Sequence, residues 1–356
     1  MKNYLRIVVF SFLYKFIRLI VVYSCYFFQQ CRGRLKDLEL AIDCGDKITE
    51  VCRRSMLCDT VFSFDIPDTL GVCLYDLYFP SPLTFSSFKS HVDTLDIWMA
   101  LGAGGGCFKT ILLDSSEGNK RPRIVELTGA RRGCFLNAMG LPGKGVDQFL
   151  EELPQLSIHR YRRPLGFSLW GHDVRTYQQL FDRFFIALSK VDFPYYYELN
   201  LSCPNMASGI TVVHKLDHIQ HLLRYIRSKT QAVVGVKVSP DFDNDYLCQL
   251  MDVLRTFDKV FINCGNTRFK TLDSLHLEPD SMSVGHGGLS GALLFNRTLE
   301  MTGLLNPFGI PIMATGGISS CDHVSRLRDE GAVLFGIATA LIFDPFVIPK
   351  IHQRLV

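Results

Sequence analysis

Residues 310–319 read IPIMATGGIS, an apolar run of strand length that ends in two glycines. A second run, AVLFGIATAL at 332–341, follows after a stretch with helical periodicity. In a barrel of eight parallel strands, the loops after the last two strands commonly hold a phosphate with backbone N–H groups. The two runs therefore predict the seventh and eighth strands of such a barrel. The predicted phosphate site between them consists of Gly316, Gly317, Ala338 and Thr339.

The same alternation of apolar and amphipathic stretches extends back to about residue 71. Alternating strands and helices are typical of βα units around a buried parallel sheet. The helical stretches include 174–190, 215–229, 244–256 and 321–330. The strand-length runs are 83–87, 105–109, 133–137, 164–169, 195–200, 232–238, 258–263, 310–315 and 332–337. Eight or nine strands favour an α/β fold of the (β/α)8 TIM barrel type over an open sheet.

The first thirty residues differ from the rest in composition. MKNYLRIVVFSFLYKFIRLIVVYSCYFFQQ is strongly apolar and aromatic, but Arg6, Lys15 and Arg18 interrupt it. No uncharged run reaches the ~18–20 residues of an unambiguous spanning helix, and the basic residues do not share one helical face. A membrane anchor or membrane-associated helix pair is the favoured interpretation. A secretory signal and an ordinary packing helix are the alternatives.

We therefore expect three segments along the chain. They are a hydrophobic membrane-associating segment at 1–30, a helical connector at 31–70, and the barrel at 71–356 as the catalytic domain. The basic residues Arg32, Arg34 and Lys36 favour a barrel that faces the cytoplasm, because positive charge beside a membrane segment marks the cytoplasmic side. A cytoplasmic protein without membrane contact is the alternative.

Composition excludes several partners. The net charge is +3 and no stripe of Arg and Lys with interleaved aromatics occurs, so we expect no nucleic-acid partner. The twelve cysteines are scattered without a CxxC pair, which argues against a zinc or iron–sulfur site. Several lie in apolar runs, so we interpret them as reduced core thiols and not as a disulfide framework.

Polar residues gather where the predicted strands end. They comprise lysines, carboxamides, one thiol, a glycine pair and a threonine: Lys109, Asn137, Asn200, Cys203, Asn205, Lys237, Asn263, Asn266, Gly316, Gly317 and Thr339. The set has no carboxylate pair and no histidine pair, so glycosidase chemistry and an obvious metal site are excluded. Carboxamides both donate and accept hydrogen bonds, which suits a planar ligand edged with amide and carboxylate groups. Together with GGLSG at 287–291, which we expect to be another glycine-rich loop, the set indicates a phosphate-bearing planar ligand such as FMN.

Two strand-end residues indicate chemistry. Lys237 ends the apolar run AVVGVKV (232–238), so its side chain must point into the barrel mouth. There its charge can stabilise an anionic reduced flavin. Cys203 lies in the polar loop of ELNLSCPN (198–205), where a cysteine is usually placed for its sulfur chemistry. A small buried hydrophobe is the alternative reading of Cys203.

From about residue 70 to its end, the chain resembles the dihydroorotate dehydrogenases, the FMN-dependent barrels of pyrimidine biosynthesis. No single stretch of the resemblance is decisive, but the order and spacing of the matching stretches make a chance agreement very improbable. The stretches are EGNKRPRIVE (117–126), LNAMGLPGKG (136–145), ELNLSCPN (198–205), GVKVSPDFD (235–243), INCGNT (262–267), GGLSG (287–291), ATGGISS (314–320) and TALIF (339–343).

The resemblance implies a role for each matching residue in the oxidation of dihydroorotate to orotate. Cys203 is similar to the general base that takes the proton from C5 while hydride leaves C6 for flavin N5. The substrate-binding positions are Lys109, Asn137, Asn200, Asn205, Asn266 and Thr267. The FMN-binding positions are Ser87, Lys109, Asn200, Lys237, Gly288, Gly316, Gly317, Ala338 and Thr339. No metal is implied.

The resemblance divides between two classes of the family. A cysteine base is similar to the soluble class, whereas GGLSG and the hydrophobic N-terminus resemble the membrane-bound, quinone-using class. The electron acceptor therefore stays open between a quinone and a soluble acceptor such as fumarate. A pyridine-nucleotide route would need an iron–sulfur partner, which nothing in the chain indicates. A homodimer is one expected assembly.

Two departures from the family pattern concern the pocket. Phe88 stands where the family usually has a glycine that lets backbone approach the flavin, and Trp170 replaces a smaller residue near Ser168. Two alternative functions stay open, and the departures motivate the second of them. One is a related FMN barrel that acts on another dihydropyrimidine. The other is a catalytically inactive, membrane-bound scaffold.

Overall fold

The barrel is closed and built from eight parallel strands, as the sequence predicts. In the computed structural model, which describes residues 2–55, 58–201 and 215–355, each strand pairs with its neighbours and the last pairs with the first. The strands are β3 (Leu83–Phe85), β4 (Gly105–Ile111), β7 (Leu165–Leu169), β8 (Tyr195–Asn200), β9 (Val234–Val238), β10 (Val260–Cys264), β13 (Ile312–Thr315) and β14 (Ala332–Ile337). The seventh and eighth strands are the two runs from which the fold was predicted.

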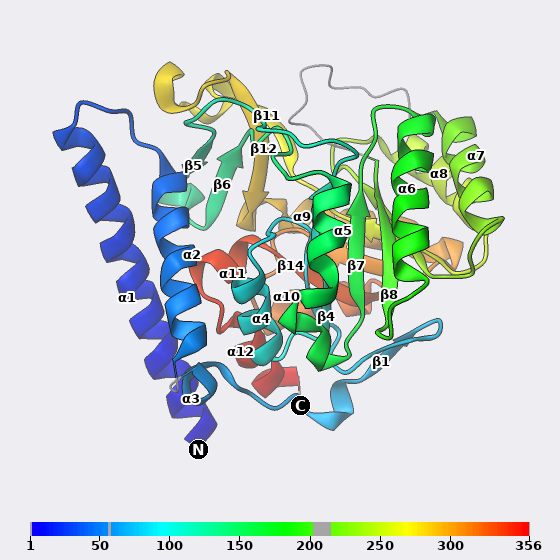
Figure 1. Ribbon diagram of the computed structural model, residues 1–356, viewed down its shortest axis with the longest axis horizontal. Coiled ribbons are helices and arrows are strands. Elements are labelled where there is room, and N and C mark those ends of the chain that lie inside the picture. The colour runs from blue at the N-terminus through cyan, green and yellow to red at the C-terminus, as the bar shows by residue number, and fades with distance from the viewer. Residues whose placement is uncertain (1, 56–57, 202–214, 356) are drawn as a thin grey trace.

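Helices surround the barrel and follow its strands in the order expected of a (β/α)8 fold (Figure 1). They are α4 (Val92–Ala100), α5 (Val146–Glu152), α6 (Val174–Leu188), α7 (Leu216–Arg227), α8 (Asn244–Leu254), α9 (Phe295–Leu305), α10 (Cys321–Asp329), α11 (Thr339–Phe343) and α12 (Val347–Leu355). Helix α6 shows why they form. Asp173 caps its first turn by accepting a hydrogen bond from the Thr176 N–H, and Tyr177, Phe181 and Phe184 bury one face against the barrel.

A four-stranded antiparallel sheet is added to the barrel by two insertions. One insertion follows β4 and supplies β5 (Ile124–Glu126) and β6 (Cys134–Asn137); the other follows β10 and supplies β11 (Arg268–Thr271) and β12 (His286–Gly291). Both insertions leave the barrel at the carboxyl ends of its strands, so the sheet lies on the side of the barrel mouth (Figure 1).

This sheet corrects two predictions. The run 133–137 is strand β6 of the added sheet and not a barrel strand. It was mistaken because Cys134, Phe135 and Leu136 are as buried as barrel residues. GGLSG (287–291) lies in strand β12 and is not a loop.

A hairpin of β1 (Val72–Leu74) and β2 (Leu77–Phe79) closes the opposite end of the barrel. Phe79 is fully buried and packs in one cluster with Tyr196 and Phe261 from the strands. This apolar cluster fills the amino-terminal end of the barrel. Polar side chains inside the barrel are therefore concentrated toward its carboxyl end, where sites of this fold are built.

The N-terminal extension consists of α1 (Lys2–Cys31), α2 (Leu38–Arg54) and α3 (Cys58–Phe62), with α1 and α2 side by side (Figure 1). A surface helix usually turns its apolar face toward the protein and its polar face toward solvent. Helix α1 instead turns several polar groups toward the body of the protein. Ser11 donates to Asp344, Tyr14 donates to the carbonyl of Ile342, and Arg18 pairs with Glu126 at 2.6 Å. The Arg18 contact, with that of Lys15 to Asp344, explains why charges interrupt the apolar segment.

The outward face of α1 is largely apolar, although Lys15 on the same helix has 51% of its side chain exposed. The exposed apolar side chains are Tyr4, Leu5, Val8, Val9, Phe12, Leu13, Phe16, Ile17, Leu19, Ile20, Tyr23, Phe27 and Phe28. Within the described residues, no helix has both the length and the apolar character required to span a membrane. The eleven cysteines of the described ranges are free, but Cys31 and Cys73 are exposed and so do not fit the expected core position. The division at residues 30 and 70 stays a prediction.

Candidate active site

A buried polar network lies inside the barrel at its mouth. Lys237 of β9 is only 6% exposed, and its Nζ donates to Ser87 Oγ at 2.9 Å. Ser87 donates in turn to Glu198 Oε1 at 2.8 Å, and Asn263 Nδ2 donates to Glu198 Oε2 at 2.8 Å. The predicted cofactor residues Ser87 and Lys237 are thus in direct contact, held by a carboxylate from β8.

Glu198 was not among the predicted site residues. Its side chain is fully buried in β8 and joins Ser87, which lies just after the first barrel strand, to Asn263 of the sixth. The available signal was a single acid within the otherwise uncharged run YYYELN at 195–200. A buried charge is costly unless it is paired and hydrogen-bonded, so an acid in a buried strand indicates a partner nearby.

A second network joins the predicted substrate-binding carboxamides. Asn200, at the end of β8, donates from Nδ2 to Thr110 Oγ1 at 3.0 Å and accepts from Asn266 Nδ2 at 3.1 Å. Asn266 also accepts from the Thr267 backbone N–H at 2.9 Å. Tyr177 of α6 fixes the strand end by donating to the Asn200 carbonyl at 2.6 Å. The structure therefore brings Asn200, Asn266 and Thr267 together.

Asn137 and Gly288 meet in the added sheet. They are register partners in β6 and β12, and Asn137 Nδ2 donates to the Gly288 carbonyl at 3.1 Å. Asn137 was predicted at the end of a barrel strand and instead ends β6. The two strands lie close together here. A Cβ at Gly287 would meet the Asn137 carbonyl oxygen at 2.6 Å, so this position needs glycine.

Lys109 of β4 points toward the loop that follows the added strand β6. Its Nζ donates to the Pro142 carbonyl at 2.7 Å. Burial lowers the pKa of Lys109 from its ordinary value to about 8, and the nearby positive charge of Arg123 contributes in the same direction. The charge of Lys109 is therefore poorly solvated and available to an anion.

The two glycine loops follow neighbouring strands, since Thr315 of β13 pairs with Gly336 of β14. Gly317 has φ +73°, and a Cβ there would lie 2.5 Å from the Phe295 backbone nitrogen. No other residue type fits this position without a shift of the backbone. Ala338 immediately precedes α11, which begins at Thr339.

Some of the buried polar atoms without hydrogen-bond partners lie at the same end of the barrel. In the described part of the chain these include Ser86 Oγ and Thr315 Oγ1, from the ends of β3 and β13, and Asn263 Oδ1 from β10. A Cβ on Gly336 would lie 2.7 Å from Ser86 Oγ and 2.1 Å from Thr315 Oγ1, so the two hydroxyls converge over a glycine. Orphaned buried groups call for a partner. This cradle fits a polar planar ring such as a flavin.

The two departures from the family pattern, Phe88 and Trp170, follow the barrel strands β3 and β7. The Phe88 ring stacks on Trp98 of α4, with ring centroids 5.4 Å apart. Trp170 is buried, and its Nε1 has no hydrogen-bond partner in the described part of the chain. Cys203 and Asn205 lie outside the described residues, so their predicted roles rest on the sequence.

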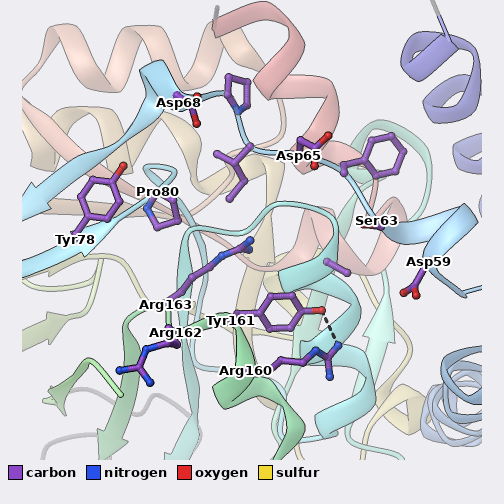
Figure 2. A pocket seen from close by; sticks show the side chains of 14 residues that line it. Asp59, Ser63, Asp65, Asp68, Tyr78, Pro80, Arg160, Tyr161, Arg162 and Arg163 are labelled. Atoms are coloured by element: carbon purple, nitrogen blue, oxygen red, sulfur yellow. Dashed lines mark hydrogen bonds between the residues drawn. The ribbon is translucent and has the colours of Figure 1, made fainter. Parts of the chain in front are cut away.

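A cavity of about 950 Å³ opens at the other end of the barrel. Figure 2 shows its lining, with Arg160, Arg162 and Arg163 from the segment before β7. Asp59 of α3 and, after that helix, Asp65 and Asp68 also line it. It contains none of the predicted site residues. Because the active sites of this fold lie at the carboxyl ends of the strands, we place the chemistry at the barrel mouth.

The fold and the polar mouth define a TIM barrel built to bind a small polar ligand over its strands. The family model for dihydroorotate dehydrogenase matches residues 69–356. The chain therefore belongs to the dihydroorotate dehydrogenase family, whose members are oxidoreductases of pyrimidine biosynthesis.

Relatives with different electron acceptors are similarly distant. The NAD(+)-type catalytic subunit of Anoxybacillus flavithermus is 29% identical over 80% of this chain and 88% of its own length. The quinone-type enzyme of Gloeobacter violaceus is 26% identical over 83% of both chains. The fumarate-type enzyme of Lactococcus lactis subsp. cremoris is 28% identical over 74% of this chain and 85% of its own. Identity therefore does not single out an acceptor.

The solved structure of a ligand-free dihydroorotate dehydrogenase from Eimeria tenella has the same fold. Its TM-score is 0.72 at 20% identity, over 87% of this chain and 92% of that one.

Proposed function

We propose that this protein oxidises dihydroorotate to orotate with FMN as its cofactor. The observation that carries the proposal is the pairing of Asn200 with Asn266 at the barrel mouth, at 3.1 Å. These carboxamides lie at the ends of the fourth strand and just after the sixth, where a planar substrate with amide and carboxylate edges can be held. Family membership supports the reaction.

The cofactor would be held by the residues that line the glycine cradle and the buried network. Ser87 and Lys237 would face the ring, and the phosphate would lie against backbone N–H groups of the paired loops, at Gly316, Gly317, Ala338 and Thr339. Bound FMN would supply the hydride acceptor for the reaction.

The chain's own residues would supply binding and proton transfer. Asn137, Asn200, Asn205, Asn266 and Thr267 would orient the substrate, and Lys109 would attract its carboxylate. Cys203 would take the proton from C5 as its thiolate. A free thiol has a pKa of about 8.5, so Cys203 needs neighbouring groups that favour the thiolate near neutral pH.

Flavin reduction tests the reaction. Purified protein should be yellow, and dihydroorotate should bleach the flavin without oxygen. Cys203→Ala should keep the flavin but lose most of the bleaching, because proton abstraction from C5 needs the thiolate. A colourless folded protein, or bleaching that Cys203→Ala leaves unchanged, would contradict the proposal. The same preparation tests the alternatives, since bleaching by another dihydropyrimidine alone would indicate the related barrel enzyme.

The electron acceptor and the location are coupled questions. The many exposed apolar side chains of α1 support membrane association, because large exposed apolar patches mark interaction surfaces. A membrane position would favour a quinone, and a cytoplasmic position a soluble acceptor such as fumarate. Parallel reoxidation of the reduced protein with a quinone and with fumarate distinguishes the two. A homodimer stays an expectation.

Vesicle binding tests the location directly. Phe12→Asp with Phe16→Asp changes two side chains that are 73% and 53% exposed on α1. We expect at least a tenfold loss of sedimentation with phospholipid vesicles, since a charge on the face that would enter the membrane opposes its insertion. Ile186→Asp, at a 60% exposed position on α6, is the matched control. Equal binding by both variants would exclude α1 as the contact.

A further inference from the structure

We propose that Glu198 is a positioning residue that sets the electron affinity of the bound flavin by offsetting the charge of Lys237. This inference rests on the proposed FMN site. Glu198 touches neither glycine loop in the described contacts, and its two carboxylate oxygens are occupied by Ser87 and Asn263 at 2.8 Å each. It acts through these neighbours.

The geometry makes Glu198 and Lys237 a charge pair with one hydroxyl between them. Lys237 Nζ donates to Ser87 Oγ at 2.9 Å, and the same hydroxyl donates to Glu198. Both charged side chains are buried, Lys237 at 6% and Glu198 at 0% exposure. Buried opposite charges interact strongly because little water screens them. Removing one partner leaves the other charge uncompensated.

The negative charge of Glu198 is also felt deeper in the barrel. Cys107 of β4 is buried, and its pKa is raised well above the ordinary value, first by burial and then by the charge of Glu198. Lys237 acts in the opposite direction on the same thiol. Glu198 and Lys237 therefore impose opposing fields on a group inside the barrel, and a ring at the mouth would feel the same two charges.

A direction follows for the flavin. Reduction adds negative charge to the ring, and Lys237 favours that charge whereas Glu198 disfavours it. Glu198→Gln keeps the size of the side chain and removes its charge. The uncompensated Lys237 should then stabilise the reduced flavin, so the midpoint potential should become more positive.

The test is a spectroscopic redox titration of the FMN-loaded full chain. For Glu198→Gln we expect at least a tenfold change in the equilibrium between oxidised and reduced flavin, which is a positive shift of about 30 mV for two electrons. Asp96→Asn, which neutralises another buried carboxylate held by Arg160 at 2.7 Å, is the control and should leave the potential unchanged. An unchanged or more negative potential in Glu198→Gln would overturn the proposal.

Glu198→Asp keeps the inference testable if the glutamine variant does not fold or retain flavin. The charge is preserved but the arm is one methylene shorter, so it cannot hold Ser87 and Asn263 at their present distances. We expect the Kd for FMN to rise at least fivefold with the potential near that of the wild type. Wild-type affinity in this variant would refute the positioning role. If the wild-type chain itself binds no FMN, the proposed function fails instead.

Discussion

Ser11 in α1 donates a hydrogen bond of 2.8 Å to Asp344, the residue that directly follows α11. Asp344 also accepts from Lys350 at 2.5 Å and pairs with Lys15 at 3.1 Å. One carboxylate thus connects the N-terminal helix, the end of α11 and the C-terminal helix. Since α11 begins at the predicted phosphate loop, the N-terminal helix is packed against the element that continues from that loop.

Asp344→Asn should therefore loosen α1. Asp344 has only 12% of its side chain exposed, but the two lysines are 51% and 35% exposed, so solvent screens part of their attraction. We expect the free energy of unfolding to fall by about 1–2 kcal/mol. Urea unfolding measures the loss, and limited proteolysis should cut α1 earlier. Asp322→Asn, at an exposed pair with 3.9 Å separation, should change neither. Equal behaviour of the two variants would refute the connection.

Gly317→Ala should damage the phosphate loop. The glycine has φ +73° and a Cβ would press on the Phe295 backbone, so the loop must move or strain. We expect a stability loss of about 2 kcal/mol and weaker FMN binding. Gly285→Ala is the matched control, because a Cβ there meets no atom within 4 Å. Calorimetry and flavin fluorescence measure the two effects. Unchanged FMN affinity in Gly317→Ala would argue against a phosphate at this loop.

The kcat/KM for dihydroorotate should fall above about pH 8. Burial lowers the pKa of Lys109 to about 8, so the free enzyme loses this positive charge as the pH rises through that value. Neutral Lys109 no longer attracts an anionic substrate, so kcat/KM should fall about tenfold for each further pH unit. Lys109→Arg should move this limb upward, because arginine stays charged. Should the arginine variant keep the same falling limb, another group must cause it.

The sequence predicts the barrel well because its strands are buried on both faces and therefore appear as apolar runs between amphipathic helices. All eight strands coincide with predicted runs. The sequence misleads where another sheet has the same pattern. Phe135 of β6 is buried against Phe343 at 4.9 Å between ring centroids, so 133–137 has the apolar pattern of a barrel strand. Burial alone does not identify the sheet to which a strand belongs.

The same distinction applies to the candidate site, where some residues can be predicted from the sequence and others cannot. The positions of Asn200 and Lys237 at the barrel mouth could be predicted because the fold places the strand ends together, whereas their roles stay predictions. Glu198 could not, because it lies within a strand and its partners come from elements far apart in the sequence, at Ser87 and Asn263. The inward polar contacts of α1 were also missed. Apolar composition indicated a membrane segment, but Ser11 meets Asp344 across 333 positions of sequence.

His352 should make the fold sensitive to acid. It lies buried in α12 with Nε2 at 2.7 Å from Ser81 Oγ, and burial, followed by the charge of Arg163, lowers its pKa to about 4. In the unfolded chain its pKa is about 6.5. Between these values the unfolded state binds more protons, so stability is retained above pH 6.5 and falls as the pH drops toward 4.

The expected loss from this histidine between pH 7 and pH 4.5 is about 2.5 kcal/mol. Glutamine does not titrate, so the free energy of unfolding of His352→Gln should fall over this range by about 2.5 kcal/mol less than that of the wild type. This holds even if the variant is less stable at pH 7. Urea unfolding at a series of pH values measures the difference in slope. His276→Gln, at an exposed position, should keep the wild-type slope. If His352→Gln loses as much stability on acidification as the wild type, the buried histidine is not the acid-sensitive group.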